Sequence, residues 1–169
     1  GAGPIGLLAA GIGVQRGLEV HVLDRVTSGP KVDLVRTIGA TYHSTSVKDL
    51  DFEPDIIIEC TGVGAVIAQS IVKVGAGGTV CLTGVGTGGM AGGAAIADVA
   101  AGAVLRNNVI VGSVNANRRH WYKAGEALAR ANREWLGRLV TRREKPEDFR
   151  RALERQPDDI KVVIQFSDL

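Results

Sequence analysis

The chain begins with Gly1-Ala2-Gly3-Pro4-Ile5-Gly6 and continues into the apolar run Leu7-Leu8-Ala9-Ala10. Glycines at this spacing predict a tight turn that opens into a helix. Such a turn allows a backbone to approach a pyrophosphate closely, and it points the free N–H groups of the helix N-terminus toward the negative charge. The stretch therefore predicts a dinucleotide-binding site.

A second glycine-rich stretch, Gly84-Val85-Gly86-Thr87-Gly88-Gly89, has the same spacing and also follows a strand-like run. The two differ in what comes next. After Gly6, a predicted helix is followed by a strand over residues 18–23 that ends at Asp24. That position is near the offset of about twenty residues at which a carboxylate meets the adenosine ribose. We therefore assign dinucleotide binding to the first stretch and interpret the second as a glycine loop.

Helical and strand-like segments alternate along the chain with short loops between them. This pattern is typical of a parallel sheet wrapped by helices. The predicted helices cover residues 5–16, 31–38, 63–74, 94–105, 121–133 and 146–155, and the strands cover 18–23, 56–60, 79–82, 109–112 and 158–166. Residues 5–16 are expected to form a buried helix, and 56–60 a strand buried on both faces. Residues 135–140 are ambiguous, and the pattern does not decide which sheet the final strand joins.

The fold class that follows is α/β, with a Rossmann-type doubly wound parallel sheet. The strand that precedes the glycine turn is central in such a sheet, and here the chain begins on the turn itself. We therefore expect the first strand to be absent and the chain to be part of a longer protein. Ligands bind beyond the carboxyl ends of the strands, so one crevice is expected from the strand-end residues. These are Asp24, Thr61-Gly62, Thr83-Gly84 and Ser113-Val114-Asn115.

Composition narrows the function classes. The 169 residues are 45% hydrophobic and 22% charged, which is ordinary for a globular domain. No apolar run long enough for a membrane span and no signal peptide is present, so we expect a cytoplasmic protein with no membrane partner. A net charge of +2 is too small to indicate a nucleic-acid partner.

Metal-binding and nucleophilic sites have little support in the sequence. Cys60 and Cys81 each lie in an apolar strand-like run without metal-ligand spacing, so both are expected to be core thiols. The histidines, His21, His43 and His120, stand in no serine or cysteine motif. We therefore expect neither a metal site built on these cysteines nor a nucleophilic triad in this chain.

The chain resembles the coenzyme-binding half of zinc-type medium-chain dehydrogenases/reductases, particularly their microbial glucose 1-dehydrogenase branch. The resemblance rests on GAGPIG, the strand ending at Asp24, Ile58-Glu59-Cys60-Thr61-Gly62 and the stretch 107–115. The sugar branch is indicated by 113–121 and by Asp159-Ile160-Lys161-Val162-Val163.

This resemblance implies a two-domain oxidoreductase. Residues 1–157 would form the NAD(P)-binding domain, and 158–169 would return to a GroES-like catalytic domain that is otherwise missing and carries the zinc. The chain alone would then be inactive. The intact enzyme would oxidise the C1 hydroxyl of an aldose to a lactone, and we expect a small-molecule substrate and a homo-oligomer. Another medium-chain alcohol, polyol or threonine dehydrogenase, or a non-catalytic NAD-binding module, remains the alternative.

The resemblance also implies roles for individual residues. Gly1, Gly3 and Gly6 would form the turn, and the amide of Ile5 would bind pyrophosphate because Pro4 has no N–H. Thr61, Gly62, Thr83, Gly84 and Val85 would place backbone against the cofactor. Ser113, Val114 and Asn115 would meet the nicotinamide, with the Asn115 side chain facing cofactor or substrate hydroxyls.

The cofactor is expected to be NAD in preference to NADP. Asp24 would accept hydrogen bonds from both ribose hydroxyls and repel a 2′-phosphate. Lys31 corresponds to the ribose-side lysine of the family, and Arg25 could stack on adenine or meet a phosphate. Relatives in the sugar branch often use NADP with a neutral residue at this position, and Asp24 departs from that pattern.

Overall fold

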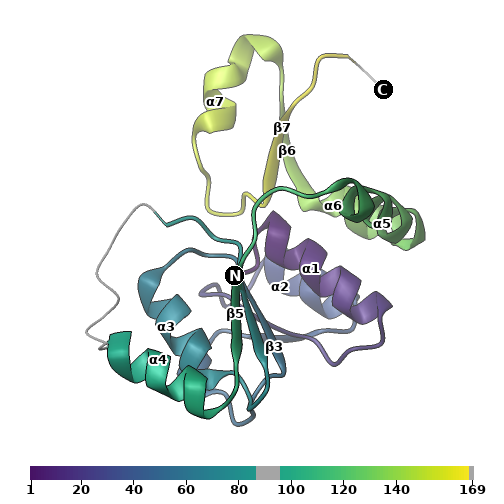
Figure 1. Ribbon diagram of the computed structural model, residues 1–169. Helices are drawn as coiled ribbons and strands as arrows, with labels where there is room; N and C mark the ends of the chain where they lie inside the picture. The colour runs from purple at the N-terminus through teal and green to yellow at the C-terminus, as the bar shows by residue number, and fades with distance from the viewer. Residues whose placement is uncertain (87–95, 168–169) are drawn as a thin grey trace. The chain divides into compact units, whose positions relative to one another are not determined.

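The computed structural model describes residues 1–86 and 96–167. It divides into two compact units, drawn together in Figure 1. The sheet unit comprises residue 1 and residues 44–117, and the split unit comprises residues 2–43 and 118–169. None of the helices within the described residues is long and apolar enough to span a membrane.

The sheet unit is built on three parallel strands in the order β3-β4-β5, which are β3 (Ile56–Glu59), β4 (Thr79–Leu82) and β5 (Val109–Gly112). Ile56 pairs with Thr79, and Thr79 in turn pairs with Val109. The connecting helices α3 (Gly64–Lys73) and α4 (Ile96–Leu105) lie on one face of this sheet (Figure 1). The short helix η1 (Val47–Asp49) contacts α3. The parallel connectivity confirms the βαβ pattern predicted from the sequence.

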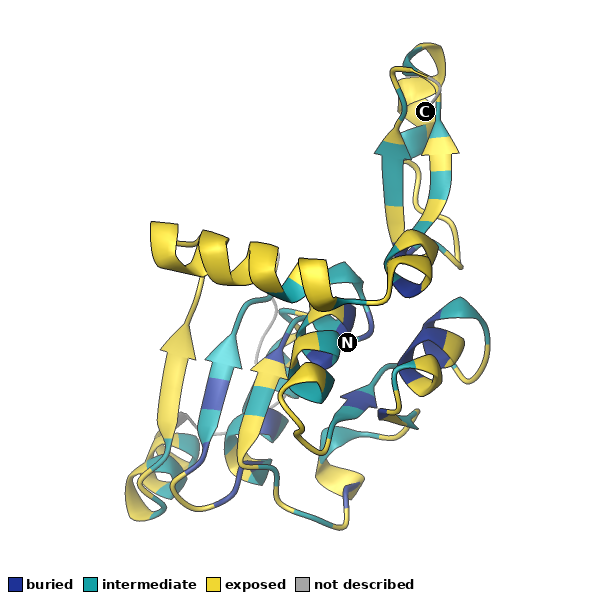
Figure 2. Ribbon diagram, turned by 90° about the vertical axis from the view of Figure 1, so that its right-hand side faces the viewer, coloured by how far each residue is buried: buried dark blue, intermediate teal, exposed yellow. Residues whose placement is uncertain are grey.

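The prediction that β3 is buried on both faces is wrong. Ile56 is 58% exposed and Ile58 is 44% exposed. β3 is an edge strand of its sheet, and the helices of the sheet unit cover only one face. β5, the other edge, is exposed along its whole length, as Figure 2 shows, whereas Val80 of the central strand is fully buried.

The N-terminal part of the split unit contains α1 (Pro4–Gln15), β1 (His21–Leu23), α2 (Pro30–Thr37) and β2 (Thr41–His43). β1 and β2 pair in parallel, with His21 opposite Thr41. β1 is shorter than the predicted strand, and β2 was not predicted. Gly39, at φ +82°, ends α2 as the sequence indicates. α1 buries Leu7 and Ala10 and leaves much of its remaining surface accessible, so the expectation of a buried helix holds for one side only.

The C-terminal part of the split unit contains α5 (Arg118–Arg130), α6 (Arg133–Leu139), β6 (Val140–Glu144), η2 (Pro146–Asp148), α7 (Phe149–Leu153) and β7 (Lys161–Ile164). The side chain of Asn132 accepts a hydrogen bond from the Trp135 amide and so begins α6. The ambiguous stretch 135–140 is therefore the end of a helix followed by a new strand. β7 pairs in parallel with β6, and the predicted helix over 146–155 is a 3₁₀ turn followed by the short α7.

One hydrophobic core joins the two parts of the split unit. It includes Leu7 and Leu34 from the N-terminal part and Trp135, Leu139 and Ile160 from the C-terminal part. The indole Nε1 of Trp135 donates a buried hydrogen bond of 2.9 Å to the carbonyl of Leu34. This bond satisfies the indole N–H, the only polar group of the Trp135 side chain, while the rest of the ring packs in the apolar core.

Candidate functional site

The glycine turn leads directly into α1. Gly3 precedes the helix in extended backbone conformation (φ −78°, ψ −178°), and Pro4 occupies the first helical position. A Cβ atom at Gly3 would meet no described atom within 4 Å, so the space beside the turn is open. Ile5 and Gly6 lie in the first turn of the helix, where amide groups have no intrahelical acceptor. The turn thus combines backbone donors that have no intrahelical acceptor with open space beside Gly3, two features of an anion-binding helix terminus.

Asp24 is tied to this turn. Its Oδ2 accepts a hydrogen bond of 2.7 Å from the amide of Ala2, and its Oδ1 accepts one of 2.7 Å from the amide of Arg25. The backbone amide of Asp24 donates to the carbonyl of His43 at 3.1 Å, which holds the end of β1 against β2. The carboxylate that was predicted from its offset to the glycines is therefore in direct contact with the turn, through the amide of Ala2.

The surroundings of Asp24 favour its ionised form. Burial acts to raise the pKa of this carboxyl, but the Ala2 hydrogen bond, the Lys31 charge and the Arg25 hydrogen bond together hold the pKa below its usual value. The neighbouring Tyr42 responds in the opposite sense, because burial and the Asp24 charge both raise its pKa. Asp24 is thus a stable negative charge beside the turn.

Lys31 completes the cluster. It lies at the start of α2, is only 8% exposed, and places Nζ 3.7 Å from Asp24 Oδ2. The predicted residues Gly3, Pro4, Asp24, Arg25 and Lys31 therefore all belong to the split unit, and its fold connects Asp24 to the turn through Ala2.

The strand-end residues of the sheet unit are organised by Glu59, which the sequence analysis did not select. Glu59 is 3% exposed at the end of β3. Its Oε1 accepts a hydrogen bond of 2.7 Å from the amide of Thr61, and its Oε2 accepts one of 3.0 Å from the amide of Gly62. The carbonyl of Glu59 accepts a hydrogen bond from the hydroxyl of Thr83 at 2.9 Å. One buried residue thus positions both predicted loops.

The loops after β3 and β4 pack backbone against backbone. Gly62 has φ +70°, and a Cβ atom there would lie 2.6 Å from the amide nitrogen of Gly86 and 2.7 Å from the carbonyl carbon of Val85. A Cβ atom at Gly84 would likewise collide with the backbone at Gly62. Only glycine fits at these two positions. The rest of the second glycine stretch, residues 87–89, lies outside the described residues.

The remaining predicted residues also fall in the sheet unit. A Cβ atom at Gly1 would lie 2.8 Å from the Thr61 side chain, so the first glycine is required for close packing. The amide of Ser113 donates to the carbonyl of Leu82 at 2.9 Å, which extends the sheet beyond β5. Val114 is exposed, and Asn115 adopts a left-handed conformation with φ +61°. Within residues 1–86 and 96–167, the exposed Asn115 side chain makes no hydrogen bond and is available to a ligand.

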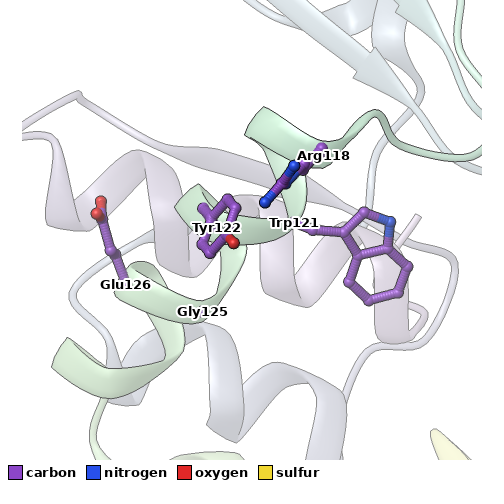
Figure 3. Close-up of a pocket in the computed structure, with 5 residues that line it drawn as sticks. All are labelled: Arg118, Trp121, Tyr122, Gly125 and Glu126. Carbon is purple, nitrogen blue, oxygen red and sulfur yellow. The ribbon is translucent and has the colours of Figure 1, made fainter.

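A separate groove lies on α5. It has a volume of about 780 Å³ and is lined by Arg118, Trp121, Tyr122, Gly125 and Glu126. Figure 3 shows these residues on successive turns of a single helix, and the Arg118 guanidinium lies 5.8 Å from the centre of the Tyr122 ring. The groove contains none of the predicted cofactor residues.

The described residues contain no cluster of three or more His, Cys, Asp or Glu side chains placed to hold a metal ion. Cys60 and Cys81 are free thiols, both partly buried. The hydroxyl of Thr83 lies 3.3 Å from the sulfur of Cys60, so this thiol lies beside the strand-end loops of the sheet unit.

Comparison with known families gives a match over residues 1–166 to the family described as glucose dehydrogenase C-terminus. The chain belongs to this family. The match extends from the glycine turn through β7, so both units belong to one family pattern.

Individual members of the family agree with this assignment. The chain is 36% identical to glucose 1-dehydrogenase 2 of Vulcanisaeta moutnovskia over 98% of its own length and 49% of the relative. It is 37% identical to glucose 1-dehydrogenase of Thermoproteus tenax over 98% of its own length and 48% of the relative. The chain thus spans about half the length of the curated relatives it matches.

Solved structures extend the comparison to three dimensions. The glucose dehydrogenase of Haloferax mediterranei, in complex with NADP, Zn and gluconolactone, superimposes with a TM-score of 0.88 at 28% identity. The match covers all of this chain and half of the Haloferax chain. An alcohol dehydrogenase of Thermotoga maritima matches with a TM-score of 0.79 at 25% identity, over 97% of this chain and 48% of the other. The fold is therefore that of Rossmann-type dehydrogenases.

Proposed function

We propose that this chain is the coenzyme-binding portion of an NAD(P)-dependent dehydrogenase that oxidises the C1 hydroxyl of an aldose, such as glucose, to a lactone. Family membership supports the reaction class, and the glycine turn and the strand-end loops supply the groups that a dinucleotide needs. In the proposed complex, the split unit binds the adenosine and pyrophosphate half of the cofactor. The loops Thr61-Gly62 and Thr83-Gly84-Val85 of the sheet unit are proposed to place backbone against the adenosine and nicotinamide halves, and Ser113-Val114-Asn115 is proposed to meet the nicotinamide.

The hydrogen bond of 2.7 Å from the Ala2 amide to Asp24 carries this proposal. It keeps an ionised carboxylate beside the turn expected to bind pyrophosphate, where the adenosine ribose of a bound dinucleotide would lie. A carboxylate accepts hydrogen bonds from ribose hydroxyls and repels a 2′-phosphate. NAD is therefore the proposed cofactor in preference to NADP, although the Haloferax relative was solved with NADP.

The chain's own contribution to the reaction is positioning. Hydride transfer to the nicotinamide is chemistry that the cofactor supplies when it is bound. Asn115, whose side chain is exposed and free of hydrogen bonds among the described residues, is proposed to contact the nicotinamide or a sugar hydroxyl. Holding the two reactants in a reactive geometry removes a large part of the entropic barrier.

The catalytic zinc is proposed to lie in a separate catalytic domain of a longer protein, to which residues 158–169 would return. The length of the relatives supports this arrangement, because the chain spans only 49% and 48% of the two glucose 1-dehydrogenases compared above. A homo-oligomer in the cytoplasm is proposed for the intact protein.

Calorimetric titration with NAD and with NADP tests the cofactor proposal. The unmodified protein is expected to bind NAD more tightly. Asp24→Asn, which retains an acceptor for Ala2 but removes the charge, is expected to shift the ratio of the two dissociation constants about tenfold toward NADP. Asp33→Asn removes a comparable charge from an exposed position on α2 and should leave the ratio unchanged. Tighter binding of NADP by the unmodified protein contradicts the preference, and binding of neither contradicts the function.

A substrate panel tests the reaction in the intact, longer protein. Aldoses are expected to give the highest rates of NAD reduction, well above those with polyols, threonine and simple alcohols. A protein that oxidises simple alcohols and leaves aldoses untouched would contradict the sugar assignment while leaving the dinucleotide site intact.

A further inference from the structure

The split unit contains a cavity of about 370 Å³ between the glycine turn and the C-terminal segment. Gly3 and Pro4 line it from the start of α1, and Lys31 lines it from the start of α2. Arg155 and Asp159 line it from the segment that connects α7 to β7. The cavity therefore joins the predicted cofactor turn to a part of the chain in which the sequence analysis selected no cofactor-binding residue.

The charges of this cavity are not balanced. The Asp159 carboxylate is engaged elsewhere, because it accepts hydrogen bonds of 3.1 and 2.8 Å from the Arg142 guanidinium and one of 2.8 Å from the Gln156 amide. The Lys31 side chain is only 8% exposed, and its ammonium pairs with the Asp24 carboxylate at 3.7 Å. Arg155 is exposed, and within the described residues it has no hydrogen bond and no ion pair, while its charge helps to lower the pKa of Asp159. The Arg155 guanidinium is therefore the group left to face an anion.

The donors of the cavity suit a pyrophosphate better than a carboxylate ligand. A guanidinium presents paired N–H groups that match two phosphate oxygens, and a pyrophosphate diester carries two negative charges. The turn at Gly3 and Pro4 is where the proposed function locates this group, but Pro4 itself has no N–H to donate. A cation opposite the backbone donors completes the binding of a doubly charged group.

We propose that Arg155 is a pyrophosphate-binding residue, and that the segment between α7 and β7 forms one wall of the cofactor site. This inference rests on the proposed dinucleotide function. It assigns to Arg155 a contact with the part of the cofactor that NAD and NADP share, so its effect is independent of the choice between them.

Titration of the protein with NAD, NADP and adenosine tests this assignment. Arg155→Gln is expected to weaken NAD and NADP about tenfold and by the same factor, because a charge-assisted hydrogen-bonded pair is lost. Adenosine, which has no phosphate, is expected to bind equally well to both proteins. Arg155→Lys keeps the charge without the paired donors and should give an intermediate loss.

Arg150→Gln is the matched control. Arg150 is an exposed arginine on α7, near the Phe149 ring, and it does not line the cavity. The Arg150→Gln variant loses the same charge as Arg155→Gln and should leave the affinities for NAD, NADP and adenosine unchanged. Melting temperatures of the Arg155 variants are expected to stay close to that of the unmodified protein, since Arg155 is exposed and forms no hydrogen bond or ion pair among the described residues.

Several outcomes overturn the assignment. These are unchanged NAD affinity in Arg155→Gln, an equal loss in Arg150→Gln, an equal loss for adenosine, and a loss confined to NADP, which would point to the 2′-phosphate. Failure of the unmodified protein to bind NAD or NADP at all would instead overturn the proposed function, so the two failures are distinguishable.

Discussion

The two units hold their candidate site residues by different means. In the split unit, the charged Asp24 holds the residues together, because it accepts backbone hydrogen bonds from Ala2 and Arg25 and lies beside Lys31. In the sheet unit, close backbone packing holds them together: Gly62 and Gly84 pack against each other, and the buried Glu59 accepts hydrogen bonds from the loop amides. The comparison teaches that the candidate residues of the split unit should be sensitive to charge and pH, and those of the sheet unit to the volume of a single methyl group.

The largest effect is expected from Gly62→Ala. The new Cβ atom would lie 2.6 Å from the Gly86 amide at a φ of +70°, so strain and overpacking should together lower the free energy of unfolding by about 3 kcal/mol. Urea unfolding measures this loss.

Gly77→Ala is the control for the backbone strain alone. Gly77 has φ +71° in the same unit, but its Cβ position is clear of described atoms within 4 Å. A loss of about 1 kcal/mol is expected there. Equal losses in the two variants would show that the loops after β3 and β4 do not depend on close packing.

A smaller effect is expected from Glu59→Ala. This change leaves the amides of Thr61 and Gly62 without their acceptor in a partly buried setting, which should cost about 2 kcal/mol of unfolding free energy. Glu59→Gln retains one carbonyl acceptor and should lose less. Hydrogen exchange at the Thr61 and Gly62 amides gives a local readout, and unchanged protection in Glu59→Ala would contradict the positioning role.

The smallest effect concerns acid sensitivity in the split unit. The folded-state pKa of Asp24 is below its usual value of 3.8, so the folded protein binds this proton less readily than the unfolded chain does. The resulting stabilisation is fully present above the usual value, declines as the pH falls below it, and is lost below the lowered pKa. Unfolding free energies at pH 6 and pH 3 should therefore differ less in Asp24→Asn than in the unmodified protein. An equal difference in both proteins would mean that Asp24 does not carry this linkage.

The sequence predicted the elements whose local signals are strong. Continuous apolar runs located β4 and β5 to the residue, and the offset from the glycines located Asp24. β2 was missed because Thr41–His43 is short and lacks an apolar run. β6 was missed because two arginines interrupt its apolar pattern, and in the structure Arg142 is held by Glu144 and Asp159.

Among the candidate site residues, too, some have a local sequence signal and others are brought into place only by tertiary packing. Glu59 ends the run Ile56-Ile57-Ile58-Glu59, and an acid directly after an apolar run could have suggested a loop anchor. Arg155 had no such signal. It lies far along the chain from the glycine turn, and only the packing of the split unit brings it to the cavity that Gly3 lines.

The hydrogen bond from Trp135 to Leu34 also bears on the order in which the protein can fold. It joins residues 101 positions apart, and the hydrophobic core around it draws on both ends of the chain. The sheet unit, apart from Gly1, is one continuous segment. During synthesis, residues 44–117 leave the ribosome before Trp135 does. The apolar faces of α1 and α2 therefore remain uncovered until α6 has been synthesised. A chain stopped before Trp135 would therefore expose Leu34 and be prone to aggregation.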